Sequence, residues 1–321
     1  MKYMLKDSLR LFRDILFGIY CFTYDAVYYF IYSGVRNLYS YRTRLFKLAK
    51  AYHSIEKGLS SPEFDKSRGG TSIELVKYLL KRGLKKDSVI TMSDIGAYKA
   101  IEEYEKASGK EILDIELRRH LSEISKLSPV RSGALSVRMP AEANGLGRMS
   151  NLYAFQRRSV RNYSPKKIPM QLVNEVINHA LSAPSACNRS PWYVYKSVSR
   201  EIIDEALVHQ NGNKGFGHLA QGLFIVTVDL RAYDNLAERK QAWVDGGIFV
   251  MNLLTALHME GFVSCSLNWC KYPWGEGGIR RRFKIERSRV IVSMIAFGFP
   301  LDEYKVCVSQ RPKVCDMSEE L

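Results

Sequence analysis

A short arginine-rich segment carries the most distinctive functional groups of this sequence. From Gln156 to Tyr163 it reads Gln-Arg-Arg-Ser-Val-Arg-Asn-Tyr, so three guanidinium groups and one hydroxyl lie within five residues. Arg binds phosphate oxygens through paired hydrogen bonds, and Ser adds a short donor. The segment therefore predicts a phosphate site, and the alternative is a solvated basic surface. The residues concerned are Arg157, Arg158, Ser159 and Arg161.

A second segment, Ala183–Trp192, reads Ala-Pro-Ser-Ala-Cys-Asn-Arg-Ser-Pro-Trp. Its two prolines and several small residues predict a rigid loop with exposed backbone donors. Asn188 adds an amide that both donates and accepts hydrogen bonds. Such a loop can lie against a planar polar ring, and the alternative is an ordinary connection between a helix and a strand.

The pattern of apolar residues indicates the elements that hold these two segments. Apolar residues three and four apart predict helices between residues 36 and 127, whereas helices and strands are mixed from residue 152 onward. Between Ser128 and Asn151, Pro and Gly residues interrupt the apolar pattern, and we interpret this segment as a linker. In the second half we expect helices at 169–181, 244–260 and 279–284, and strands at 192–198, 223–229, 262–267 and 290–297.

The order of these features resembles the FMN-dependent nitroreductase family. An Arg-Arg-Ser-x-Arg segment is followed by a helix, by Ala-Pro-Ser-x-x-Asn-x-x-Pro-Trp and by a strand. Downstream, Asp245-Gly-Gly opens a long helix that ends in Glu260-Gly-Phe, a Ser-Cys-Ser-Leu strand follows, and Gly298-Phe-Pro closes the last strand. The resemblance covers roughly residues 152–315, about half of the chain.

The resemblance implies a fold and a domain arrangement. The implied class is α+β, with a mixed, mainly antiparallel sheet flanked by helices and preceded by a mostly helical N-terminal region. We expect a helical region at 1–127, a linker at 128–151 and an FMN-binding domain at 152–321. Members of the family bind FMN non-covalently at a homodimer interface, so the resemblance implies a homodimer with the flavin between its subunits.

The resemblance also implies which residues touch the cofactor. The arginine-rich segment would hold the phosphate and the ring edge, and the Pro-Ser-x-x-Asn loop would reach the flavin from the partner subunit. The strand after the long helix would line the flavin face, and a basic residue near the C-terminus would reach the phosphate. The expected FMN-binding residues are Arg157, Arg158, Ser159, Arg161, Pro184, Ser185, Ala186, Asn188, Ser266, Leu267, Asn268 and Arg311. One departure from the family is Ser190, where many relatives carry Gln.

The implied activity is that of an oxidoreductase. NAD(P)H would reduce the flavin and leave, after which an electron-poor acceptor would occupy the same face, giving a ping-pong mechanism. Because the flavin carries the chemistry, no catalytic acid or nucleophile is assigned. The acceptor and the choice between NADH and NADPH stay open. The alternative is a membrane-surface or complex-forming protein that keeps the flavin fold as a structural or sensing unit.

The net charge narrows the class of partners. The chain of 321 residues has 48 Lys or Arg against 33 Asp or Glu, a formal net charge of +15. Residues 151–200 carry eight basic residues against one acidic residue, and residues 1–50 carry nine against three. Because the excess lies in two places, it favours a small anionic cofactor and a second local anionic surface over a nucleic acid.

Two His-x-x-Glu pairs in the helical half, His53/Glu56 and His120/Glu123, each share a helix face. Four such ligands could hold a metal, but no further carboxylate pattern accompanies them, so no metal site is expected. A second reading of His53 and Glu56 is a polar cap over the flavin pocket.

The N-terminus carries an apolar, aromatic run from Leu9 to Val35, interrupted by Arg13, Asp14 and Asp25. These charges disfavour a membrane-spanning helix. A helix at a membrane surface and a helix packed on its own protein or on a dimer mate both fit the run. The flanking basic residues are Lys2, Lys6, Arg10, Arg36, Arg42 and Arg44.

The expected location is the cytoplasm, with peripheral contact to the inner face of the membrane through residues 1–35 if the run meets lipid. Six Cys without disulfide or zinc spacing suggest reduced thiols. No small-residue cleavage site follows the apolar run, so a secretory signal peptide is not expected.

Overall fold

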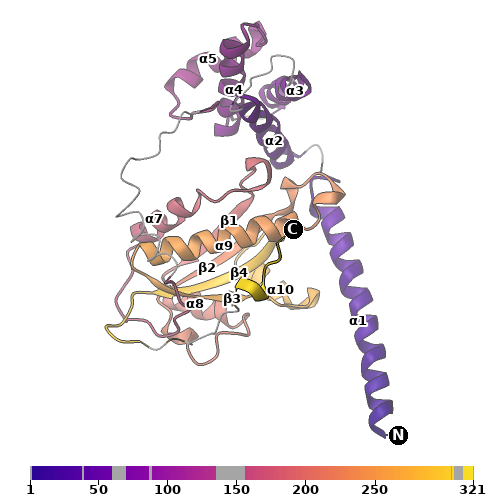
Figure 1. The fold of residues 1–321 in the computed structure, drawn as a ribbon, viewed down its shortest axis with the longest axis vertical. Helices are drawn as coiled ribbons and strands as arrows, with labels where there is room; N and C mark the ends of the chain where they lie inside the picture. The colour runs from indigo at the N-terminus through magenta and orange to yellow at the C-terminus, as the bar shows by residue number, and fades with distance from the viewer. Residues whose placement is uncertain are drawn as a thin grey trace.

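The computed structural model describes residues 2–37, 40–59, 70–86, 89–134, 156–304, 306 and 314–320. A group of helices lies beside a unit that contains a sheet, and the first helix extends away from that unit (Figure 1). The expected linker at 128–151 falls largely outside the described residues, so the domain boundaries stay a prediction. The helices of the N-terminal half are α1 (Lys2–Tyr32), α2 (Tyr41–Leu59), α3 (Gly70–Lys86), α4 (Met92–Ser108) and α5 (Ile115–Leu127).

Four strands form one antiparallel sheet in the order β1-β2-β4-β3. The two central strands are β2 (Gly222–Asp229) and β4 (Arg289–Gly298), and every residue of β2 is buried. Strands buried in this way read as continuous apolar runs, because both faces of the sheet are covered. The edges are β1 (Trp192–Ser197) and β3 (Val263–Asn268).

Helices cover both faces of the sheet, and alternate side chains of β2 point to opposite faces. On one face, α7 (Met170–Ala180) and α9 (Gln241–Met259) pack against Phe224 and Val226. On the other face, α8 (Arg200–Leu207) and α10 (Gly277–Arg282) pack with Leu223 and Ile225. The α+β class, the antiparallel sheet and the helical N-terminal region are therefore confirmed (Figure 1).

The expected elements of the second half are all present, with ends displaced by at most three residues. Helix α8 is the helical stretch that the sequence indicates before Gly215. The dinucleotide-like Gly215-x-Gly217-x-x-Ala220 segment precedes a strand rather than following one. Because a dinucleotide fingerprint needs the strand first, this segment is a connection and not a nucleotide site.

Helices α2 to α5 share a core of their own around Leu48, Leu80, Ile101 and Leu117. A buried ion pair joins α2 to α4, because the Arg44 guanidinium lies 2.7 Å from the Asp94 carboxylate. The same carboxylate completes the capping box of α4 with Thr91. Arg44 is therefore a structural residue, and the interpretation of its charge as part of a basic membrane flank is wrong.

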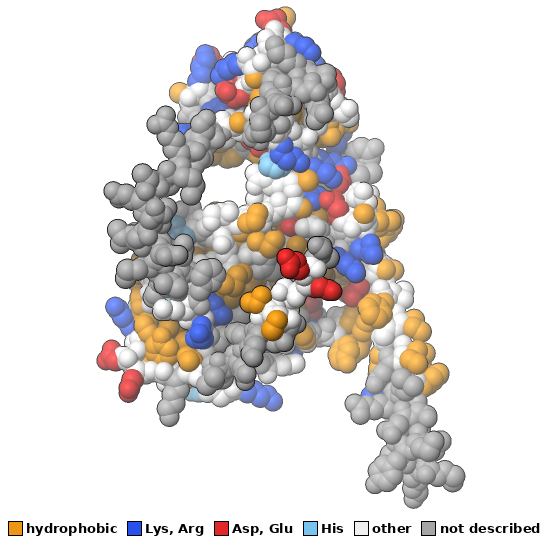
Figure 2. Space-filling view, viewed as in Figure 1, with side chains coloured by type: hydrophobic (Ala, Val, Ile, Leu, Met, Phe, Trp, Pro, Cys, Tyr) orange, Lys and Arg blue, Asp and Glu red, His pale blue; other side chains and the backbone are white. Residues whose placement is uncertain are grey.

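Helix α1 packs on the sheet-containing unit through one face of its C-terminal half. The Tyr29 hydroxyl donates to the Asn235 carbonyl at 3.0 Å, and the Gly34 amide donates to the Tyr233 carbonyl at 2.8 Å. Packing on its own protein therefore describes one face of the helix. The opposite face is exposed, and apolar side chains gather on the described part of α1 in Figure 2.

Helix α9 crosses the sheet closely at Gly246, where a Cβ would lie 2.7 Å from Val292 Cγ2 and 3.1 Å from Val228 Cγ2. A Gly246→Ala substitution is therefore expected to destabilise the fold by about 1–3 kcal/mol, because the two valines have little rotamer freedom with which to make room for the added methyl group. The neighbouring Gly247 is the matched control, since a Cβ there meets nothing within 4 Å. Equal urea midpoints for Gly246→Ala and Gly247→Ala would show that the contact carries no stability.

Candidate functional site

The arginine-rich segment lies along the outer edge of β3. Ser159 forms a parallel bridge with Ser264, and the Val160 amide donates to the Ser264 carbonyl at 3.0 Å. Val160 is buried, and its own carbonyl accepts a hydrogen bond from the buried Tyr163 hydroxyl at 2.8 Å. The backbone is thus fixed to the sheet while neighbouring side chains turn outward. Arg157 and Ser159 are half-buried, and Arg158 and Arg161 are exposed.

Strand β3 presents a polar face beside this segment. Ser266 and Asn268 are exposed, whereas Leu267 between them is 3% exposed and belongs to the core. Gln210 fixes the end of the strand, since its Nε2 donates to the Asn268 carbonyl at 2.8 Å. The Leu267 side chain therefore cannot line a flavin, and only its backbone can contribute. The prediction of Leu267 as a contact residue is thereby limited to its backbone, because side chains alternate along a strand.

Two arginines of the segment, Arg158 and Arg161, have different surroundings. Arg158 Nη1 donates to the carbonyls of Gln156 and Arg157, at 3.2 and 3.1 Å. The Arg161 guanidinium lies 5.8 Å from the centre of the Phe216 ring and lines an open pocket of about 470 Å³ with Asn162, Glu303 and Tyr304. The pocket lies next to the segment and is of a size typical for small-ligand sites.

The Pro-Ser-x-x-Asn loop holds an unusual backbone conformation. Cys187, Asn188 and Ser190 have φ of 52°, 52° and 44°, so three residues other than glycine lie in the left-handed region. Such conformations cost about 1–3 kcal/mol each and concentrate at functional sites, where the surroundings hold them. Asn188 is exposed; its backbone amide donates to the Ser185 carbonyl at 3.0 Å, whereas its side-chain amide bonds to no residue that the structure describes. The loop therefore displays this side-chain amide from a strained backbone.

Two buried charged groups hold this loop. Asp245 is 1% exposed and accepts hydrogen bonds from the Ala186 amide at 3.1 Å, the Gln241 amide at 2.9 Å and the Tyr233 hydroxyl at 2.9 Å. Arg189, also buried, donates to the Ala186 carbonyl at 2.9 Å and pairs with Glu238 at 2.6 Å. The loop is thus fixed through both the backbone amide and the carbonyl of Ala186.

The electrostatics of the network keep Tyr233 and Arg189 protonated, as their hydrogen bonds need. Burial, and then the charge of Asp245, raise the pKa of Tyr233 well above its usual value, so the hydroxyl stays a donor. Burial opposes the charge of Arg189, but the hydrogen bond and the charge of Glu238 outweigh it and raise the pKa. Sequence reasoning missed the roles of Asp245, Arg189 and Tyr233, although Asp245 stands in the quoted Asp-Gly-Gly.

The two parts of the predicted site lie at opposite edges of the sheet. The loop leads into β1, whereas the arginine-rich segment and Ser266 lie on β3, and β2 and β4 separate them. Three spacings between neighbouring strands amount to about 14 Å. One flavin ring cannot touch both parts within one chain, so the predicted residues of a single chain make two half-sites.

Helix α2 lies against the loop helix η1 (Ala186–Asn188). Lys50 joins the two regions, since its ammonium lies 3.1 Å from the Asp234 carboxylate and 3.9 Å from that of Glu238. Glu238 in turn holds Arg189. The helical N-terminal unit is therefore fixed beside the loop that carries Asn188.

Several other predicted residues lie apart from these half-sites. Arg311 is outside the described residues. His53 Nδ1 lies 3.2 Å from Glu56 Oε2 on α2, whereas His120 contacts the Glu116 carbonyl on α5. Across the described ranges, no three His, Cys, Asp or Glu side chains gather as metal ligands would.

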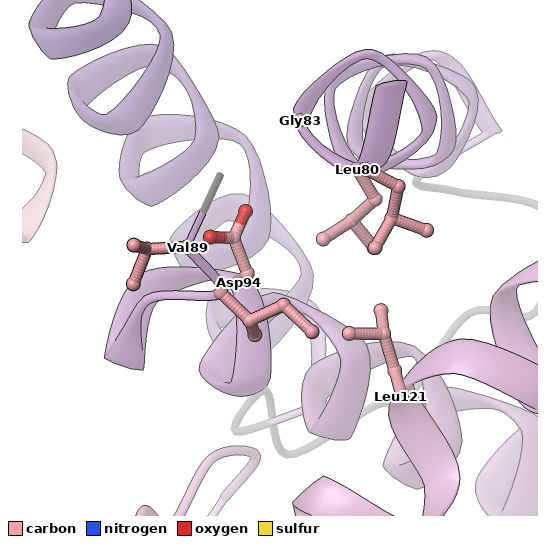
Figure 3. A pocket seen from close by; sticks show the side chains of 7 residues that line it. Leu80, Gly83, Val89, Asp94 and Leu121 are labelled. Atoms are coloured by element: carbon pink, nitrogen blue, oxygen red, sulfur yellow. The ribbon is translucent and has the colours of Figure 1, made fainter. Parts of the chain in front are cut away.

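A separate pocket of about 210 Å³ lies inside the helical unit. Leu80 and Leu121 lie on one side of it, and Val89 and Asp94 lie on the other (Figure 3). Because both Asp94 oxygens already bond Arg44 and Thr91, the pocket offers no free carboxylate. We assign it to the packing of the helical unit.

Comparison with known proteins gives a match to the second half of the chain. The family model described as the nitroreductase family matches residues 154–299. A protein of Methanothermobacter thermautotrophicus, named for NADH dehydrogenase and NAD(P)H nitroreductase, is 30% identical over 151 residues, which cover 46% of this chain and 74% of the relative. A protein of Archaeoglobus fulgidus with the same name is 28% identical over 162 residues, covering 46% of this chain and 84% of the relative.

Solved structures also resemble this half. A nitroreductase-like protein of Streptococcus mutans has a TM-score of 0.48 and 19% identity, covering 55% of this chain and all of that one. An FMN-dependent nitroreductase of Clostridium difficile has a TM-score of 0.41 and 19% identity, covering 49% of this chain and 91% of that one. The match to the family model and to the relative from Methanothermobacter thermautotrophicus shows that the chain belongs to the nitroreductase family of oxidoreductases.

Proposed function

We propose that the chain is an FMN-dependent oxidoreductase that uses NAD(P)H to reduce an electron-poor acceptor. The observation that carries this proposal is the placement of the arginine-rich segment along the polar edge of β3. Ser159 pairs with Ser264 there, and Ser266 and Asn268 follow on the same strand with exposed side chains. Guanidinium groups and a hydroxyl suit a dianionic phosphate, and the polar side chains of Ser266 and Asn268 suit the polar edge of a flavin ring. Family membership supports the same assignment.

The residues of the chain would divide the work of holding FMN. Arg157 and Ser159 would bond the phosphate and the ring edge, with Arg161 and Arg158 adding positive charge. Ser266, Asn268 and the backbone of Leu267 would line the ring. Arg311 is a further candidate for the phosphate. A fixed positive charge near the ring also favours the negative charge that develops on reduction.

When bound, FMN supplies hydride transfer, first from NAD(P)H and then to the acceptor, in a ping-pong sequence. The chain itself contributes binding and orientation. The Asn188 amide can donate and accept at one ring edge. Because Asp245 and Arg189 fix the backbone beside it, that amide would be held in place before the cofactor binds.

The two half-sites support a homodimer with a flavin at each interface. In a two-fold dimer the loop of one protomer can meet the β3 edge of its partner, and the reverse contact is then equivalent. Helix α9 offers an apolar surface suited to such an interface, since four large apolar side chains between residues 241 and 251 are exposed in the single chain. They are Trp243, Val244, Ile248 and Met251.

A mixed dimer tests the arrangement. Two differently tagged chains, one Arg157→Ala and the other Asn188→Ala, are co-expressed and the heterodimer is isolated. If each flavin is held across the interface, one site carries both substitutions and the other carries neither, so about half the wild-type FMN sites return. A heterodimer that binds no more FMN than the two single variants, or a chain that stays monomeric, would contradict the proposal.

An anaerobic titration with NADH and then NADPH tests redox competence directly. The oxidised flavin band should bleach with one donor, and an electron-poor quinone should restore it. A purified protein that is colourless and cannot be reconstituted with FMN would instead leave the interaction-protein alternative standing.

A further inference from the structure

The first helix carries an apolar surface that the oxidoreductase site does not use. Along α1 the outward side chains follow one another at intervals of three and four residues, so they form one stripe. Each of them is exposed, and none carries a charge. The stripe consists of Phe12, Ile15, Ile19, Phe22, Ala26 and Phe30, widened by Leu16 and Val27. From Phe12 to Phe30 it is about 27 Å long.

The opposite side of α1 is partly covered, since Phe17, Tyr20 and Tyr24 stay 46%, 50% and 37% exposed. Tyr20, Tyr24, Tyr28 and Tyr32 are spaced by four residues and contact one another in sequence, with ring centroids 4.6 to 6.4 Å apart. Trp274 packs on this row, 5.9 Å from Tyr20 and 6.2 Å from Phe17. The helix therefore has one side that contacts Trp274 and another side, formed by the stripe, whose side chains are all exposed.

We propose that the outward stripe of α1 binds the surface of a lipid bilayer with anionic headgroups, with the helix lying in the plane of the membrane. An apolar face wider than a third of the helix circumference, rich in Phe and Ile, is the usual form of an interfacial helix. The charge is complementary, because residues 1–36 carry five basic residues against three acidic ones. This count leaves out Arg44, Lys47 and Lys50, whose charges are paired with Asp94 and Asp234. The apolar side chains would enter the lipid while basic residues outside the stripe meet the headgroups.

The contacts of α1 argue against a spanning orientation. By length and composition Ile15–Tyr32 could cross a bilayer, and so could the half-buried core helix α9. However, the Tyr28 hydroxyl donates to the Arg287 carbonyl, and the Tyr29 hydroxyl donates to the Asn235 carbonyl. A spanning helix would draw these polar groups of the sheet-containing unit into hydrocarbon, where they are costly. A helix lying in the membrane surface keeps both contacts.

Flotation of the full-length flavoprotein with vesicles tests this proposal. We expect binding to phosphatidylcholine vesicles that contain phosphatidylglycerol, and weaker binding without it or at high salt. The double variant Ile15→Glu/Ile19→Glu should lower the partition coefficient at least about tenfold, since two apolar side chains leave the lipid and two negative charges face it. Ile115→Glu is the matched control, because Ile115 is 86% exposed on α5, away from the stripe.

The outcomes separate lipid binding from the alternatives. Wild-type protein that does not float, or a double variant that floats as well as Ile115→Glu, would overturn the proposal. A double variant that changes the sedimentation mass, while wild-type protein ignores vesicles, would mean that the stripe covers a second copy of the chain. FMN content and the unfolding midpoint are measured in parallel, and both should stay unchanged. Failure of the oxidoreductase proposal would therefore be seen separately.

Discussion

Replacing Arg157 by Ala is expected to weaken FMN binding about 10- to 150-fold, because one charge-assisted contact to a phosphate contributes about 1.5–3 kcal/mol. Arg157 is the half-buried arginine of the segment, and the bridge between Ser159 and Ser264 fixes the backbone two residues away. A half-buried side chain next to a fixed backbone loses less freedom than an exposed one when an anion binds. Titration of the apoprotein with FMN, followed by flavin fluorescence, measures the change.

Substitutions of two other arginines serve as controls for Arg157→Ala. Arg239→Ala removes an exposed charge from the same unit and should leave the affinity within about twofold, because an isolated surface charge is screened. Arg158→Ala should have a smaller effect than Arg157→Ala, since Arg158 Nη1 is directed to the carbonyls of Gln156 and Arg157. The reverse order, with Arg158→Ala costing more, would move the phosphate contact to Arg158 and contradict the assignment.

The elements of the sheet-containing unit could be predicted because their local patterns agree with their tertiary environment. Leu223–Asp229 is a short apolar run, and the structure buries it between two layers of helices. Gly261 has a φ of 78° directly after α9, which is why that helix ends where the sequence placed its end. The alternation Ser266-Leu267-Asn268 also predicts that the Leu267 side chain turns inward, which leaves its backbone as the part that can contact a flavin.

The partners of the loop could not be predicted, because they are distant in sequence. The Ala186 amide meets Asp245 across 59 residues, and Lys50 meets Asp234 across 184. No local pattern indicates such pairs. The left-handed backbone of Cys187 and Asn188 is equally hidden, since neither residue is a glycine. Similarly, the sequence offered a membrane helix and a packed helix as alternatives for α1, and only the contacts reveal that its two sides differ.

The position of Asp245 predicts a coupled loss of stability and cofactor. Asp245→Ala is expected to destabilise the protein by about 3–5 kcal/mol, because three donors lose one buried acceptor group. The Ala186 amide is one of the three, so the strained loop loses a contact that holds Cys187 and Asn188 in place. Urea unfolding measures the first effect, and FMN titration of the folded protein measures the second.

Two matched variants decide whether the network or the charge alone is responsible. Asp204→Ala removes an exposed carboxylate that pairs with Arg200 on α8, and it should cost no more than about 1 kcal/mol. Asp245→Asn keeps one acceptor oxygen and should fall between the two. If Asp245→Ala unfolds at the same urea concentration as Asp204→Ala, the buried network does not hold the loop. If Asp245→Ala unfolds at a lower urea concentration but binds FMN normally, Asp245 supports the fold and not the site. A loop that positions Asn188 for FMN would lose that position, and the FMN affinity with it, once Asp245 is removed.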